Sequence, residues 1–188
     1  MPLYRVLQAF IVLDLGLFAL TATLGAGLDG RDEMMRHFLL GLLTSSFTCF
    51  IHVLVLFYLI GTGKDIRDAV EDYDDLRERY VPRTRALKRS VFPAACLAIV
   101  SMIVATLLGG EVHSRILAAQ GRRAVEEPDA PLPFRAVTAW WVHLLLVGIA
   151  LASSAWAFLV EVRAAKANRR GIEELNRELE AREAAREA

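Results

Sequence analysis

The sequence is poor in the residues that build redox and metal motifs. It has two cysteines, Cys49 and Cys96, in 188 residues and no CxxC spacing, so a thiol oxidoreductase is disfavoured. Both cysteines fall inside apolar runs, where we interpret them as small buried hydrophobic residues. The four histidines show no HxxxH or HExxH spacing, so the common helix-borne zinc motifs are missing.

Net charge and phosphate-binding motifs are missing as well. The 22 Lys and Arg balance the 22 Asp and Glu, and no run of like charge resembles a nucleic-acid arm. The Gly-Thr-Gly-Lys string at 61–64 lacks the first glycine of a phosphate loop and follows an apolar run rather than a strand. We therefore expect no nucleotide or nucleic-acid partner.

What the sequence does have is four long apolar runs, at residues 6–28, 38–62, 91–112 and 140–162. Each reaches the roughly 20 residues that a helix needs to cross a bilayer. Asp14 interrupts the first run, which is also too long for the apolar core of a signal peptide, so we interpret it as a retained helix. We expect an all-α integral membrane protein, with a four-helix antiparallel bundle at 1–165 that includes a helical linker at 63–90, and a charged helical tail at 166–188.

The distribution of Lys and Arg predicts the orientation. The linker, the tail and the N-terminus together hold sixteen, and the two other loops hold six. The positive-inside rule therefore predicts that both termini are cytoplasmic, and the Arg- and Ala-rich composition favours a cell inner membrane. The loop at 114–139, on the other side, has three prolines that disfavour a continuous helix.

The linker and the tail both carry helical periodicity. In the linker, apolar residues at helical spacing extend the second helix to about Tyr80, and Pro82 is expected to end it. In the tail, Ile172, Leu175 and Leu179 form an apolar seam. A seam shorter than two heptads suits either a coiled-coil dimer or a helix that is solvated or lies on the membrane surface.

Polar residues inside the second run define a candidate site. His37, Thr44, Thr48 and His52 fall, with Gly41 and Ser45, within an arc of about 100° on one helix face. Ionisable groups inside a membrane usually have a partner within the bundle. If the first two helices are antiparallel neighbours, Asp14 lies at the depth of His52. We therefore expect an Asp14–His52 pair, with Asp14 and Thr48 serving in a proton relay or holding a ligand group in place.

Three histidines are expected to share one layer near the outer surface. His37 begins the second run, His113 ends the third, and His143 follows two tryptophans of the kind found at membrane interfaces. Three neutral imidazoles suit Zn²⁺, Cu²⁺ or non-haem iron, and two from different helices suit haem b. We predict His37, His113 and His143, with Glu111, as metal ligands, and the same histidines with His52 as cofactor-binding residues.

The fourth run has one face of mostly small residues. His143, Val147, Ala150, Ser154 and Ala157 share this face, and Glu161 stands at its cytoplasmic end. Small residues let helices approach closely, so we interpret this face as a packing surface.

Three functions remain open, and no residue is assigned a catalytic role. The first is a haem b or transition-metal (Cu, Zn or Fe) protein for electron transfer, with quinone as a partner, or for metal handling. The second is a non-catalytic accessory or assembly subunit of a homo-oligomer or membrane complex, since its mixed-charge helices suit protein partners. The third is a small transporter or proton channel along the polar stripe, against which the missing inverted repeat counts. A hydrolase or transferase is disfavoured.

Overall fold

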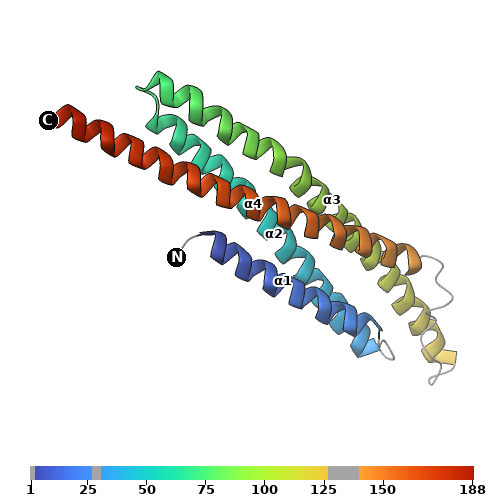
Figure 1. The fold of residues 1–188 in the computed structure, drawn as a ribbon. Coiled ribbons are helices and arrows are strands. Elements are labelled where there is room, and N and C mark those ends of the chain that lie inside the picture. The colour runs from blue at the N-terminus through green and yellow to red at the C-terminus, as the bar shows by residue number, and fades with distance from the viewer. Residues whose placement is uncertain (1–2, 27–30, 127–139) are drawn as a thin grey trace.

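The computed structural model describes residues 3–26, 31–126 and 140–188, and within them all regular structure is helical. Consecutive helices run antiparallel (Figure 1). The all-helical fold that the four apolar runs predict is confirmed. The helices are α1 (Leu3–Ala26), α2 (Arg31–Ala69), α3 (Asp74–Glu126) and α4 (Trp140–Glu187).

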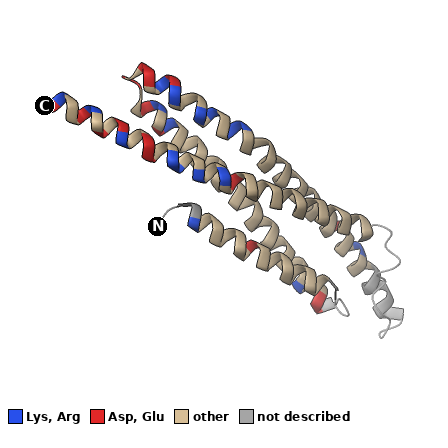
Figure 2. Cartoon of the chain, in the orientation of Figure 1, with Lys and Arg blue, Asp and Glu red and all other residues tan. Residues whose placement is uncertain are grey.

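All four helices are long and apolar enough to cross a membrane. At 1.5 Å per residue, α1 is about 36 Å long, whereas α2, α3 and α4 reach about 58, 80 and 72 Å. A bilayer core is about 30 Å thick, so the three longer helices each have a further section. Most charged side chains gather in these sections, near the C-terminus and the α2–α3 turn (Figure 2). We call this part, residues 61–91 and 161–188, the charged end, and the opposite part, which holds His37, His113 and His143, the histidine end.

A belt of exposed apolar side chains surrounds the remaining section. The large exposed apolar residues lie at 12–20 in α1, 35–60 in α2, 92–108 in α3 and 141–159 in α4. These ranges correspond to about 24–38 Å along the longer helices, close to the thickness of a bilayer core. Soluble monomers rarely expose apolar surface of this extent. The apolar belt is therefore the surface that suits lipid.

The two cysteines lie within the belt, and both are free thiols. Cys49 is partly buried between helices, but Cys96 is exposed. The expectation that both are buried is wrong for Cys96, because it lies on the outward face of α3 among exposed apolar residues.

The connection between α2 and α3 differs from the prediction. α2 ends at Ala69, and α3 begins at Asp74, so the expected end near Tyr80 is wrong. Asp74 and Asp75 occupy the first turn of α3, where acidic groups favour the positive end of the helix dipole. Pro82 lies inside α3 instead of ending a helix, as does Pro93.

Packing explains why α3 continues through both prolines. An interior proline costs a helix about 3 kcal/mol, because it removes one backbone hydrogen bond and clashes with the preceding turn. α3 packs along α2 on one side and along α4 on the other, and these contacts offset that cost. α3 also continues past the predicted end of its run to Glu126. The three prolines of the expected loop lie outside the described residues.

The tail packs against the linker of the same chain. Leu175 is buried in a cluster with Ile66, Val70, Leu76 and Tyr80. Ile172 and Leu179, the rest of the predicted seam, pack on the same cluster. The apolar seam therefore packs inside the chain, against the linker, and is not the free apolar face of a solvated or membrane-bound helix. The coiled-coil dimer stays a prediction. Three ion pairs flank the cluster: Arg79–Glu178 at 2.8 Å, Arg83–Glu174 at 2.9 Å, and Asp75–Arg182.

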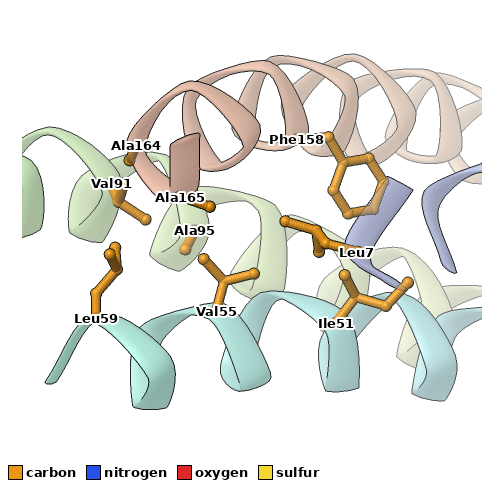
Figure 3. Close-up of a cluster of buried hydrophobic side chains, with 9 residues drawn as sticks. All are labelled: Leu7, Ile51, Val55, Leu59, Val91, Ala95, Phe158, Ala164 and Ala165. Atoms are coloured by element: carbon orange, nitrogen blue, oxygen red, sulfur yellow. The ribbon is translucent and has the colours of Figure 1, made fainter. Parts of the chain in front are cut away.

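A second apolar cluster lies where the belt meets the charged end. It joins all four helices, and we call it the apolar plug (Figure 3). Phe158, from α4, closes it on the side of the histidine end, and Leu59 and Val91 lie toward the charged end (Figure 3). Its members are Leu7, Ile51, Val55, Leu59, Val91, Ala95, Phe158, Ala164 and Ala165.

Candidate functional site

A fully buried acid–base pair joins α2 to α4. His52 Nδ1 lies 2.8 Å from Glu161 Oε1, and both side chains have no solvent-exposed surface. The His52 ring also stacks on Phe158 of the apolar plug, with ring centroids 4.6 Å apart. Burying two ionisable groups is costly unless they satisfy each other, so this contact fixes how α2 and α4 face one another.

Asp14 has a different direct partner from the one expected. Its Oδ1 accepts a hydrogen bond from Thr48 Oγ1 at 2.8 Å, and Asp14 is fully buried. The prediction of a direct Asp14–His52 pair is wrong, although the two groups lie close enough to interact electrostatically. Thr48 stands one turn before His52 on α2, which rotates it by about 40° toward α1. The same polar face of α2 thus reaches α1 through Thr48 and α4 through His52.

Several buried polar atoms of this region have no hydrogen-bond partner among the described residues. They are Asp14 Oδ2, His52 Nε2, Ser154 Oγ and Glu161 Oε2. Buried polar atoms in proteins are nearly always hydrogen-bonded, so unpartnered ones call for an explanation. These four atoms offer two carboxylate oxygens, a ring nitrogen and a hydroxyl to a proton or to water.

Hydroxyl groups link the helices between this acid–base site and the histidine end. Thr21 of α1 contacts Thr44 of α2 at 3.0 Å, with either hydroxyl able to donate. Thr106 of α3 donates to Ser45 of α2 at 2.8 Å. Thr44 is buried, as are Thr48 and His52, so the predicted polar stripe of α2 does face other helices. Hydrogen bonds of this kind hold helices together in an apolar environment.

The structure brings three histidines together at the histidine end. The ring centroids of His37 and His113 lie 5.2 Å apart, and those of His113 and His143 lie 5.8 Å apart. His37 Nδ1 is 2.9 Å from the Thr21 carbonyl oxygen, and His113 Nδ1 is 2.5 Å from that of Gly109. His143 Nδ1 is buried without a hydrogen-bond partner among the described residues. Each ring thus has a backbone hydrogen-bond partner, which for His143 is Ala105, and His143 leaves Nδ1 open.

Two glycines make room for two of these rings. A Cβ atom on Gly25 would lie 2.7 Å from His37 Cε1, and one on Gly109 would lie 2.5 Å from His143 Cε1. Both distances are shorter than real side chains tolerate. The His37 ring of α2 therefore packs on the backbone of α1 at Gly25, and the His143 ring of α4 packs on the backbone of α3 at Gly109. This arrangement positions both imidazoles at the same end of the molecule.

The metal and haem predictions find less support in this geometry. Among the described residues, no group of three or more His, Cys, Asp and Glu is arranged to hold a metal ion. Glu111 does not join the histidines, because its carboxylate pairs with Arg115 at 2.6 Å on an exposed face. A six-coordinate haem needs a porphyrin plane between its two imidazoles. The His37 and His113 rings are in direct contact, so the pair does not fit a haem as it stands.

Glu161 is the site residue that sequence reasoning missed. Its position on the His143–Ala157 face of the fourth run is visible in the sequence, but the small residues of that face indicate a packing surface. Glu161 follows His143 by 18 residues, about 27 Å, and His52 follows His37 by 15 residues, about 22.5 Å, so Glu161 lies about 4.5 Å deeper. A glutamate on the inward face of an apolar helix was the available signal.

The comparisons with known proteins add no identification. No protein-family model, curated protein or solved structure matches this chain. The site must therefore be interpreted from its own chemistry.

Proposed function

We propose that the chain is a helical membrane protein that carries protons between the histidine end and the buried acid–base site, with the apolar plug as the gate toward the charged end. The observation that carries this proposal is the His52–Glu161 contact at 2.8 Å, fully buried within helices of membrane-spanning length. Ionisable groups at such depth are costly and, in membrane proteins, mark ion or proton pathways.

His52 is the residue that transfers the proton in this proposal. An imidazole accepts a proton at one ring nitrogen and releases one from the other. A proton that leaves Asp14 is accepted at His52 Nε2, and the Nδ1 proton passes to Glu161 Oε1. One O–H bond breaks at Asp14, one forms at Glu161, and the imidazole ends neutral. The open Nε2 atom and the open Asp14 Oδ2 atom support this route.

Protons and water have easier access to the acid–base site from the histidine end than from the charged end in this proposal. Toward the histidine end, hydroxyls of Thr21, Thr44 and Thr48 lead from the Asp14 carboxylate to the His37 region. Toward the charged end, the plug offers only apolar side chains, which exclude water and block proton transfer. Transport across the membrane then requires the plug to open, whereas exchange with the histidine end does not.

Proton flux into vesicles tests the proposal. The protein is reconstituted into liposomes that contain a pH-sensitive dye, and a potassium diffusion potential is imposed with valinomycin. We expect flux above that of empty liposomes and a loss of at least tenfold in Glu161→Gln and in Asp14→Asn. Thr23→Ala is the matched control, because Thr23 is exposed on α1 and bonds only the Ala19 carbonyl of its own helix. Wild-type flux equal to that of empty liposomes would refute the proposal, as would full flux in Glu161→Gln.

A transition-metal site at the histidine end is the second candidate. The adjacent His37, His113 and His143 rings and the open Nδ1 of His143 favour it. Ring rotation would be needed, because the described side chains form no metal-binding group as they stand. Elemental analysis after incubation with Zn²⁺ or Cu²⁺ tests it. One ion per chain, lost in His143→Ala and kept in Glu111→Gln, supports a site, and a metal content no higher than in His143→Ala rejects it.

A further inference from the structure

A cavity of about 240 Å³ lies in the charged end, where α2, α3 and α4 meet. Its lining includes the buried side chains of Tyr80, Thr84 and Asn168, the guanidinium-bearing Arg83, and Gly171. It is far larger than the space that one water molecule needs. None of these residues belongs to the acid–base site, and the proposed proton transfer does not use the cavity.

The cavity lies just beyond the apolar belt, on the side of the charged end. The last exposed apolar residues before the charged end are Ile60 in α2, Phe92 in α3 and Leu159 in α4. The nearest lining residues, 66, 87 and 167, lie five to eight positions beyond them. This separation is about 8–12 Å along the helices, so the near edge of the cavity lies at the outer border of the headgroup layer, which adds about 5–8 Å to each side of the core.

The helix sections beside the cavity carry an excess of basic residues, although Glu174 pairs with the lining Arg83 and Glu178 accepts a hydrogen bond from the lining Tyr80. Residues 61–68, 83–91 and 161–171, which we call the basic collar, hold ten Lys and Arg and only three Asp and Glu. One of these acids is Glu161, which is buried and paired with His52. Beyond the collar the sign reverses, since residues 69–80 and 172–188 hold eleven Asp and Glu and five Arg. Within the charged end, the excess of basic over acidic residues therefore lies in the collar (Figure 2).

We propose that this cavity binds the headgroup of an anionic phospholipid, with Arg83 as the residue that contacts the phosphate. Basic pockets between membrane helices are a recurring form of lipid-headgroup site. Arg83 uses Nη1 for its ion pair with Glu174, and a guanidinium has five N–H donors in all. The apolar part of the lining accommodates the glycerol carbons, and the collar attracts the phosphate charge.

Native mass spectrometry of the full chain in detergent tests the proposal, with phosphatidylglycerol and phosphatidylcholine as probes. We expect bound phosphatidylglycerol at concentrations where phosphatidylcholine does not bind. Arg83→Ala should weaken this binding at least fivefold. Gly171→Leu should weaken it similarly without a change of charge, because a side chain at 171 has open space in front of it and fills the cavity.

Two matched controls separate the cavity from general electrostatics and from stability. Arg85→Ala removes the same charge from an exposed collar position that does not line the cavity, and Arg79→Ala breaks an equivalent ion pair with Glu178 beside the same Tyr80 ring. Both should change binding less than twofold. Equal losses in Arg83→Ala and Arg85→Ala would overturn the proposal, as would equal binding of the two lipids. Displacement of the lipid by soluble glycerol phosphate at the same concentration would also overturn it, in favour of a water-soluble phosphate ligand.

Discussion

His52 and Glu161 are 109 residues apart in the chain, yet their side chains meet at 2.8 Å with no exposure to solvent. The contact joins the second helix to the fourth at the depth where the apolar plug begins. It predicts strong coupling between the two residues, because removing one partner leaves the other buried without compensation.

A double-mutant cycle measures this coupling. His52→Ala and Glu161→Ala should each lower the free energy of unfolding by about 3–5 kcal/mol, the usual cost of removing one partner of such a buried pair. The double variant should cost far less than the sum, since it leaves no uncompensated partner behind. Unfolding in mixed micelles, followed by circular dichroism, gives the values. Additive losses, within about 0.5 kcal/mol, would mean that the two groups do not interact.

A side chain at Gly109 should disturb the packing of the histidine end. In Gly109→Ala the new methyl group would approach His143 Cε1 to 2.5 Å, so the ring or the helix must move. We expect a destabilisation of about 1–3 kcal/mol, typical of overpacking, with a shifted NMR signal of the His143 ring. Gly16→Ala is the control, because nothing lies within 4 Å of its Cβ position. A helical Gly→Ala change there should stabilise the protein by about 0.5–1 kcal/mol. Equal effects at both positions would contradict the described packing.

The apolar plug predicts a gain of proton flux when it is made polar. Val55 is buried in the plug, one turn from His52, and Val53 on the same helix is 37% exposed. Val55→Ser should raise flux in the liposome assay severalfold, because a hydroxyl admits water to the plug. Val53→Ser makes the same chemical change on the outward face and should leave flux unchanged. A similar flux in both variants would remove the gating role from the plug.

Ionisation of Tyr80 should weaken the packing of the charged end at alkaline pH. Burial, together with its hydrogen bond to Glu178 at 2.9 Å, raises the pKa of the Tyr80 hydroxyl above its ordinary value of 10.0. A raised pKa in the folded state means that the stability contribution is complete below pH 10 and falls as the pH rises through the folded pKa. Tyr80→Phe should cost about 1 kcal/mol at neutral pH but lose less stability above pH 10.

Thermal unfolding across this pH range checks the effect. Tyr73→Phe serves as the control, because it keeps the Tyr80–Glu178 hydrogen bond and should follow the wild-type curve. An alkaline slope of Tyr80→Phe that equals the wild-type slope would show that Tyr80 ionisation does not limit stability.

Features set by local sequence could be predicted, and features set by helix rotation could not. The apolar runs gave the four helices, because length and composition alone determine that signal. The polar stripe of α2 faces other helices as its spacing indicated, and the interface position of His37, His113 and His143 brought their rings into one layer. Both predictions needed only depth and periodicity.

Pairing required information that periodicity does not contain. Asp14 and His52 lie at compatible depths, but residues four apart on a helix differ in direction by about 40°. Thr48 therefore contacts Asp14, and His52 contacts Glu161 of the fourth helix. The end of α2 was misplaced for a related reason, because the apolar residues of the linker belong to two helices that pack on each other. Leu175 then completes their cluster, which a single-helix pattern cannot reveal.

The titration of the buried carboxyl groups tests the central claim most directly. Infrared difference spectra of the reconstituted protein, recorded as the pH is changed, report protonation of Asp14 and Glu161 through their carboxyl C=O bands. The other 20 Asp and Glu contribute carboxyl bands that are common to all variants. Beyond these, we expect a reversible band change that Asp14→Asn and Glu161→Gln each alter and that the double variant abolishes. A double-variant spectrum identical to the wild-type spectrum would contradict this expectation.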